Sequence, residues 1–221
     1  MSLVLNQVRK GFHQGETEIQ VLKGLNVAIE PGQIVAIVGQ SGSGKSTLLS
    51  LLAGLERADS GEILVDKVNL APLSEQEITL FRAQNIAIVF QQYHLIAHLT
   101  ALENVMLSLE ILKMENPRER AEEALRELGL GHRLNHFPSQ LSGGECQRVA
   151  IARALVVKPK ILLADEPSGN LDIHTGDKVM DVFFDVVRKY KITTILVTHS
   201  EALAKRCERV LRLEEGQLRE I

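Results

Sequence analysis

Residues Val38–Leu49, VGQSGSGKSTLL, place a loop rich in glycine and serine, with one lysine, between two apolar runs. The run before it, QIVAIVG (33–39), is typical of a buried strand, and KSTLLSLLAGL (45–55) is typical of a helix. The loop Gly39–Thr47 matches the pattern G-x-x-x-x-G-K-[ST], and strand–loop–helix is the context that this motif requires. The stretch therefore predicts a phosphate-binding loop in an α/β protein.

Each residue type in this loop suits a nucleoside triphosphate. Glycines let successive backbone N–H groups point at phosphate oxygens, and the helix adds its positive N-terminal end. We expect Lys45 to reach the β- and γ-phosphates, Ser46 to hold Mg²⁺ and Thr47 to contact the α-phosphate. The nucleotide-binding residues expected in the loop are Gly39, Gln40, Ser41, Gly42, Ser43, Gly44, Lys45, Ser46 and Thr47.

Three later apolar runs predict a parallel sheet. NIAIVF (85–90), KILLADE (160–166) and ITTILVTH (192–199) are nearly continuous, as in strands that are buried on both faces. Ligands of such sheets bind beyond the carboxyl ends of the strands. Besides Gly39, polar residues stand at these ends: Gln91, Asp165, Glu166 and His199.

The remaining pattern divides the chain. LVLNQV (3–8) and IQVLKGLNVAIE (19–30) are typical of strands, and Asp59–Gly61 predicts a turn before the strand EILV (62–65). Between residues 92 and 158 only helical patterns occur. We therefore expect a single domain, 1–221, with a core of residues 1–91 and 159–221 and a helical subdomain of residues 92–158 inserted into it.

Composition excludes several classes of protein. A net charge of -3 with scattered basic residues argues against nucleic-acid binding. The two cysteines are far apart without metal-ligand spacing, which excludes the usual zinc sites and fits a reducing compartment. No apolar run is long enough to span a membrane, and the first ten residues do not form a signal peptide. We expect a cytoplasmic protein.

Two more motifs decide among phosphate-loop proteins. QLSGGECQRVAIARAL (140–155) and ILLADEPSGNLD (161–172) are followed by ILVTHS (195–200). In their order and spacing these motifs resemble those of the ATP-binding-cassette (ABC) ATPases over essentially the whole chain. The resemblance implies a phosphate-loop NTPase core with a mostly parallel sheet, an N-terminal antiparallel β subdomain and an inserted α-helical subdomain. It also implies a head-to-tail homodimer that holds each MgATP between one chain's phosphate loop and the other chain's LSGGE signature.

The resemblance assigns roles in catalysis. It implies that Glu166 is the catalytic base and that His199 contacts the γ-phosphate beside Lys45. Gln91 would sense Mg²⁺ and the γ-phosphate, so the metal site would comprise Ser46, Gln91 and Asp165. Two carboxylates side by side repel each other unless a cation meets one of them, which agrees with Asp165 as the metal partner.

Further residues would complete the nucleotide site. Ser142, Gly143 and Gly144 offer a hydroxyl, N–H groups and a helix N-terminus to a partner's γ-phosphate; capping of the helix by Ser142 is the alternative. Asp172 matches the loop that crosses to the other chain's site. Phe12 lies where the family places an aromatic ring on adenine; a buried strand-end phenylalanine is the alternative.

The stretches FQQYHLIAHLTALENV (90–105) and LADEPSGNLD (163–172) resemble the branch of lipoprotein-release and macrolide-export ATPases. This implies a separate membrane permease that keeps the chain on the cytoplasmic face of the membrane and receives mechanical work. Its cytoplasmic helix would dock on Tyr93, His94, Leu95, Ile96 and Leu99; for Leu95 and Leu99, packing in the core is the alternative.

One alternative function stays open: a soluble ABC-type mechanical ATPase that acts on DNA or ribosomes, against which the single cassette and the acidic balance argue. A small-molecule kinase would leave LSGGE unexplained. Two residues depart from the family pattern. Cys146 stands where Arg or Gln is common, so a bulky thiol adduct there should hinder dimer closure, and Ser200 replaces the usual Asp after the switch histidine.

Overall fold

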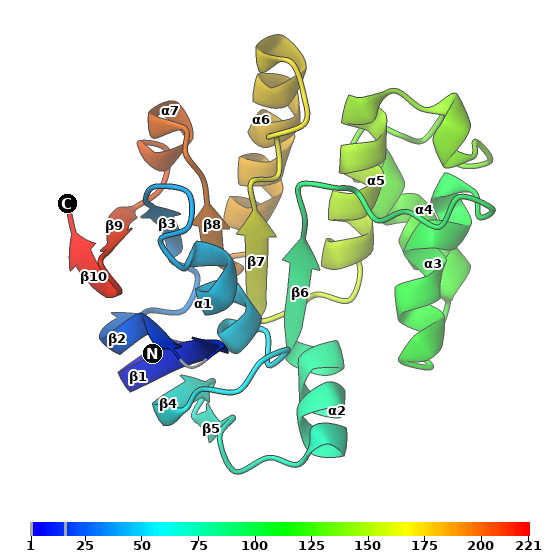
Figure 1. The fold of residues 1–221 in the computed structure, drawn as a ribbon. Helices are drawn as coiled ribbons and strands as arrows, with labels where there is room; N and C mark the ends of the chain where they lie inside the picture. Colours follow the sequence, from blue (N-terminus) through cyan, green and yellow to red (C-terminus); the bar gives the residue numbers. More distant parts are fainter. Residues whose placement is uncertain (1, 16) are drawn as a thin grey trace.

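The computed structural model describes residues 2–15 and 17–221, which form two sheets with helices around them (Figure 1). The strands are β1 Leu3–Gln14, β2 Thr17–Ile29, β3 Ile34–Val38, β4 Ser60–Val65, β5 Val68–Asn69, β6 Ile86–Val89, β7 Ile161–Asp165, β8 Thr193–Val197, β9 Arg209–Glu214 and β10 Gln217–Glu220. The helices are α1 Lys45–Leu52, α2 Glu75–Asn85, α3 Ala101–Ile111, α4 Pro117–Glu127, α5 Gly143–Leu155, α6 Ile173–Lys189 and α7 Glu201–Ala204, and a 3-10 turn, η1, covers Pro138–Gln140.

The larger sheet has the order β10-β9-β3-β8-β7-β6 and is parallel except for its edge strand β10. Its inner strands β3, β7 and β8 are almost wholly buried, as their continuous apolar runs predict. Since β3 is paired with β8 and β8 with β7, the carboxyl ends of these three strands meet at one edge. The predicted mostly parallel sheet is confirmed.

The smaller sheet is antiparallel, with the order β2-β1-β4-β5. Strand β1 runs beyond the predicted residues 3–8 because its second half pairs with β2, with Phe12 opposite Ile19. The predicted turn at Asp59–Gly61 is wrong in part, since β4 already begins at Ser60. Gly61 passes so close to β1 that a Cβ atom would lie 2.4 Å from the carbonyl oxygen of Gln7, which explains the glycine inside the strand.

Only helices lie between β6 and β7, where the sequence predicts the helical segment (Figure 1). Capping boxes at Ser74 and Thr100 begin α2 and α3, with each serine or threonine hydroxyl accepting from the backbone N–H of the residue three positions later. Helix α6 packs two fully buried aromatic rings, Phe183 and Phe184, edge to face at 5.6 Å. The helix ends at Lys189, so the basic run at residues 188–191 lies at a helix end.

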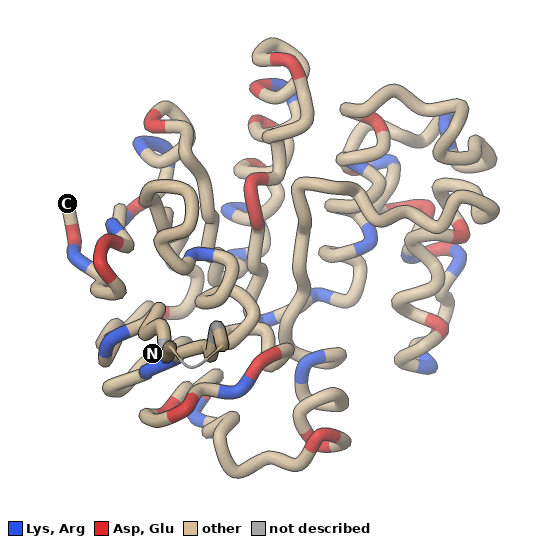
Figure 2. The backbone as a smooth tube through the Cα atoms, viewed as in Figure 1, with Lys and Arg blue, Asp and Glu red and all other residues tan. Residues whose placement is uncertain are grey.

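Charged residues of both signs are distributed over every part of the fold (Figure 2). None of the helices within residues 2–15 and 17–221 combines the length and the apolar character needed to cross a bilayer.

Candidate functional site

A cavity of about 450 Å³ opens at the carboxyl ends of β3, β7 and β8. The start of α1 forms its floor, and β1 contributes an aromatic ring. Its lining residues are Phe12, Val21, Gly39, Ser41, Gly42, Gly44, Lys45, Ser46, Thr47, Asp165, Glu166 and His199. All of these except Val21 are residues that the sequence assigns to nucleotide, metal or catalysis, although they come from four separate segments of the chain.

The loop between β3 and α1 is shaped around its lysine. Lys45 Nζ donates to the carbonyl oxygens of Gly39 (2.8 Å) and Gln40 (2.7 Å), so its ammonium group stands inside the curl of the loop. A Cβ atom on Gly39 would lie 2.4 Å from the carbonyl oxygen of Leu213, and Gly44 has a φ of 100°, so both glycines are required by the backbone. The buried hydroxyl oxygen of Ser43 has no hydrogen-bond partner among the described residues. The loop therefore offers the positive charge of Lys45 to an anion.

Asp165 and Glu166 follow the buried part of β7 and differ in their surroundings. Burial, together with the negative charge of Glu166, raises the pKa of Asp165, while Lys45 counteracts this shift. Glu166 adopts a left-handed φ of 44°, which is costly for a residue with a side chain and typical of functional sites. Its Oε2 lies 2.9 Å from His199 Nδ1, so β7 and β8 bring the predicted base and the predicted switch histidine into contact.

These residues fit a magnesium nucleotide. A cation beside Asp165 would offset the burial and the repulsion that its carboxylate experiences. Mg²⁺ prefers oxygen ligands, typically one or two carboxylates together with phosphate oxygens, and Ser46 and Asp165 supply protein oxygens at the same cavity. The phosphate oxygens would replace the loop carbonyls as partners of Lys45.

Phe12 is 42% exposed and lines the cavity, so the alternative of a buried strand-end phenylalanine is wrong. Lys10 Nζ lies 5.1 Å from the centre of its ring. The lysine is held from behind by Glu56 and Asp59, at 3.0 and 3.3 Å. A ring that is exposed at the mouth of the cavity is available for stacking on a planar ligand.

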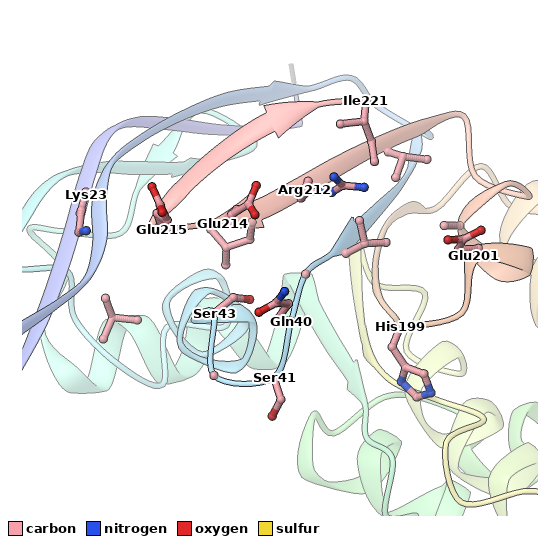
Figure 3. Close-up of a pocket in the computed structure, with 18 of the residues that line it drawn as sticks. Lys23, Gln40, Ser41, Ser43, His199, Glu201, Arg212, Glu214, Glu215 and Ile221 are labelled. Carbon is pink, nitrogen blue, oxygen red and sulfur yellow. The ribbon is translucent and has the colours of Figure 1, made fainter.

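Gln40 and Ser43 line a different cavity, of about 940 Å³, on the side of the loop that faces β9 and β10 (Figure 3). Arg212 and Glu214 lie across this cavity from them (Figure 3). The backbone of Gln40 and Ser43 still belongs to the loop that curls around Lys45, so these two residues shape the phosphate loop. Neither residue lines the 450 Å³ cavity.

Gln91 lies just after β6 and faces the turn that follows Glu166. Its Nε2 donates to Asn170 Oδ1, and Asn170 Nδ2 donates to the Gln91 carbonyl oxygen, both at 3.1 Å. The sequence analysis missed Asn170, although its amide is typical of a turn residue and follows Gly169 directly in GNLD. Asp172 caps α6 by accepting from the N–H of Thr175 at 3.1 Å, and hydrogen bonds from the side chain and then the backbone of Thr175 lower the pKa of this carboxyl. Neither Gln91 nor Asp172 lines the 450 Å³ cavity.

The signature residues Ser142, Gly143 and Gly144 also lie off this cavity. Ser142 does cap α5: its hydroxyl accepts from the N–H of Glu145 (3.3 Å), and its own N–H donates to the Glu145 carboxylate (2.8 Å). This backbone hydrogen bond, supported by the Ser142 hydroxyl and by Arg133, lowers the pKa of Glu145 to about 2. Ser142 thus caps the helix and fixes its N-terminus at the signature, and its contact with a partner's γ-phosphate stays a prediction.

The predicted docking segment, residues 93–99, is attached to the helical segment by packing and by hydrogen bonds. Leu95 packs partly against the core, as its alternative predicts, while Leu99 is half-buried. The fully buried Asn104, which the sequence analysis missed, accepts from the Ile96 N–H (2.8 Å) and donates to three carbonyl groups of residues 96–100. An asparagine within the mostly apolar helical stretch ALENVMLSLEI (101–111) is the signal that could have identified it.

The two departures from the family pattern have structural explanations. Cys146 is 6% exposed, with Sγ 3.6 Å from the Pro138 carbonyl oxygen, and burial raises the pKa of its thiol. The thiol is therefore directed into the protein and is poorly placed for the expected adduct. Ser200 caps α7 through the Leu203 N–H at 3.3 Å, and the orientation of His199 comes from Glu166.

Comparisons with known proteins agree with this geometry. A family model described as ABC transporter matches residues 22–169. The chain is 47% identical to the uncharacterized ABC transporter ATP-binding protein YbbA of Escherichia coli K12 over 219 residues, 98% of this chain and 96% of that protein. It is 46% identical to the lipoprotein-releasing system ATP-binding protein LolD of Geobacter metallireducens over 218 residues, 98% of this chain and 97% of that protein.

Solved structures of the cassette MJ0796 are also similar. One is a dimeric post-hydrolysis state bound to ADP and Pi, with a TM-score of 0.89 and 41% identity, covering 99% of this chain and 97% of that one. A second dimeric structure of this bacterial ABC transporter cassette has a TM-score of 0.90 and 42% identity, with the same coverage. The likeness extends over the mostly parallel sheet, the antiparallel sheet and the helical segment.

Proposed function

Since this chain belongs to the ABC transporter family, we propose that it hydrolyses MgATP as a head-to-tail homodimer and drives a separate membrane permease. One observation carries the proposal. The cavity brings the phosphate loop, Asp165, Glu166 and His199 together, while the signature residues 142–144 lie off it. One chain thus supplies the phosphate-loop half of its own nucleotide site. Its signature residues would supply the other half of the site on the partner chain.

The phosphate loop would bind the nucleotide. Lys45 exchanges its bonds to Gly39 and Gln40 for bonds to the β- and γ-phosphates, and the N–H groups of the loop and the N-terminus of α1 surround them. Ser46 and Asp165 would hold Mg²⁺, with Gln91 entering when the site closes. When bound, Mg²⁺ neutralises charge on the phosphate oxygens. Phe12 stacks on the adenine.

Hydrolysis would depend on Glu166. Its carboxylate orients a water molecule and accepts the proton as the water oxygen bonds to the γ-phosphorus and the bond to the bridging oxygen breaks. His199, 2.9 Å from Glu166 Oε2, fixes the carboxylate and lines the same cavity, where it would contact the γ-phosphate. Catalysis is then positioning and electrostatic stabilisation, to which Lys45 adds a fixed positive charge.

The second half of each site would come from the partner chain. Ser142 caps α5, and Gly143 and Gly144 begin it, so the N–H groups of the two glycines and the positive end of the helix dipole can meet a γ-phosphate from outside. Asp172, at the start of α6, would cross towards the partner's site. The likeness to the dimeric MJ0796 cassette supports this assembly.

The permease would bind the helical subdomain, for which we propose residues 92–158. The similarity to a lipoprotein-releasing ATP-binding protein supports an export or lipid-release role and a position on the cytoplasmic face of the membrane. Segment 93–99 offers Tyr93, His94 and Ile96 to a cytoplasmic helix of the permease.

A mixing experiment tests the head-to-tail site. Ser142→Asp keeps a good helix cap but adds a negative charge that repels a γ-phosphate, and Lys45→Ala removes the phosphate-loop charge. Each variant alone should be inactive, whereas an equimolar mixture should regain about a quarter of the wild-type rate, because half of the dimers carry one intact site. Ser142→Asn, a neutral cap, should retain activity. A mixture as inactive as its components excludes sites shared between chains.

The partner is tested by co-purification from detergent-solubilised membranes. A permease that co-purifies with the chain supports transport, whereas ribosomes or DNA in its place would indicate the soluble mechanical ATPase.

A further inference from the structure

Helix α5 holds the chain on both sides of Gln91. The signature lies at the N-terminus of α5, and the segment that follows β6 runs beside this helix (Figure 1). Three contacts connect them along its length. The hydroxyl of Tyr93 lies 2.8 Å from the position that a Cβ of Gly143 would take, and further along the helix Gln147 and Arg153 bind backbone carbonyl groups of residues 90–94.

Arg153 makes the strongest of these contacts. Its Nη1 donates to the carbonyl oxygen of His94 at 2.6 Å, and its Nη2 donates to that of Tyr93 at 2.9 Å. Arg153 is half-buried, and this partial burial lowers the pKa of its guanidinium. The two hydrogen bonds to backbone carbonyl groups replace part of the hydration that the charged group loses.

Gln147 adds a second point of attachment. The side chain is 0% exposed, and its Nε2 donates to the carbonyl oxygen of Phe90 at 3.3 Å. Its Oε1 has no hydrogen-bond partner among the described residues. A fully buried amide with one unsatisfied oxygen is unfavourable, and a position of this kind is typical of a role beyond packing.

The segment itself is strained where Arg153 binds it. His94 has a left-handed φ of 48°, and its ring stands edge to face against Phe90 at 5.1 Å. Such a backbone conformation persists only where surrounding contacts impose it. Without Arg153, we expect the backbone at His94 to relax and to take the docking segment with it.

We propose that Arg153 and Gln147 are positioning residues that make α5 a rigid connection between the signature and the segment 90–99. When the signature binds a nucleotide on the partner chain, α5 moves. Because α5 holds the chain on both sides of Gln91, Gln91 and the docking segment then move with it. The inference rests on the proposed head-to-tail function, because it needs a signature that binds nucleotide in the partner.

Hydrogen–deuterium exchange of residues 90–99 tests this connection in the Glu166→Gln background, with and without MgATP. In the parent protein we expect MgATP to protect this segment. Arg153→Met should raise its exchange about 10- to 100-fold, the effect of losing hydrogen bonds from a charged group, and should remove the response to MgATP. ATP affinity and the nucleotide-dependent dimer should persist, since the cavity residues are unchanged. Arg153→Lys should give an intermediate result, because one ammonium cannot match the planar fork.

The matched control is Arg120→Met. Arg120 also donates from a guanidinium to a backbone carbonyl in the helical segment, that of Val156 at 3.1 Å, but it does not contact residues 90–99. Its variant should leave the exchange of that segment unchanged. If Arg153→Met reduces folding, Gln147→Met removes the bond to Phe90 without a change of charge and should act in the same direction, less strongly.

The possible failures are distinguishable. A parent protein that stays monomeric with MgATP overturns the proposed function, and the inference with it. If the parent dimerises, but the exchange of residues 90–99 and its response to MgATP are as in the parent in both Arg153→Met and Gln147→Met, only the inference is overturned.

Discussion

His199 Nδ1 and Glu166 Oε2 lie 2.9 Å apart, although 33 positions separate the two residues in the chain. The contact joins the ends of β7 and β8, neighbouring strands of the parallel sheet. It orients a carboxylate whose backbone is held in a left-handed conformation at the cavity mouth. The contact with His199 therefore fixes the orientation of the Glu166 carboxylate, as a general base requires.

Glu166→Gln tests this role. The amide keeps the shape and can still bond to His199 but cannot accept the proton of water, so the hydrolysis rate should fall at least about 100-fold. ATP should still bind, and the protein should accumulate as an ATP-bound dimer in light scattering. Glu201→Gln, an exposed carboxylate on α7 outside the 450 Å³ cavity, is the control. A Glu166→Gln protein that releases phosphate at the wild-type rate would remove Glu166 from catalysis.

Gly39→Ala tests how the phosphate loop is seated. The added Cβ would lie 2.4 Å from the carbonyl oxygen of Leu213, so either the loop or β9 must shift. We expect the free energy of unfolding to fall by about 1–3 kcal/mol and the ATP affinity to fall more than about tenfold. Gly129→Ala is matched: it adds a Cβ in open space at a φ of 73°, far from the cavity. It should cost about 1 kcal/mol with ATP affinity unchanged. Equal ATP affinities of the two variants would contradict the prediction.

Phe12→Ala tests the adenine contact. Loss of a stacking ring should weaken ATP binding by about 1 kcal/mol, or roughly fivefold in Kd, while Phe12→Tyr should bind ATP as the wild type does. Ile19, the cross-strand partner of Phe12, is 45% exposed and does not line the 450 Å³ cavity, so Ile19→Ala is the control for an altered hairpin. Titration with a fluorescent ATP analogue measures all three. An equal loss in Phe12→Ala and Ile19→Ala would mean that the ring only supports the hairpin.

Local sequence predicts much of this molecule because its decisive features are local. The strand–loop–helix at Val38–Leu49 and the capping boxes are encoded in consecutive residues, and buried parallel strands have continuous apolar runs. The extension of β1 to Gln14 depends on pairing with β2, which the run at residues 3–8 does not contain.

Two of the relations that the sequence does not reveal join distant segments. Arg153 reaches Tyr93 and His94 across about sixty positions, and Asn170 reaches Gln91 across 79. No pattern in the sequence around an arginine or an asparagine predicts that its side chain will bind a distant backbone carbonyl group. These contacts become visible only when β6, α5 and β7 lie side by side.

The capping box of the signature helix should make stability depend on pH through Glu145. The backbone N–H of Ser142 and, with it, Arg133 at 2.8 Å lower the pKa of this carboxyl from 4.5 to about 2 in the folded chain. A depressed pKa means that the stabilisation is fully present above pH 4.5 and is lost as the pH falls towards 2. With a side chain only 12% exposed, the contribution is roughly 3 kcal/mol at most.

Urea unfolding of wild type and Glu145→Gln at pH 7, 5, 4 and 3 measures this contribution. Glu145→Gln should be the less stable protein at pH 7, and the difference should narrow below pH 4.5, because only the wild type binds an extra proton on unfolding there. Glu119→Gln is the matched control: Glu119 occupies the same position in the first turn of α4, whose N-cap makes no side-chain hydrogen bond. Its stability should differ little from wild type at any of these pH values. A gap between wild type and Glu145→Gln that stays constant from pH 7 to pH 3 would mean that the carboxylate charge contributes nothing to the cap.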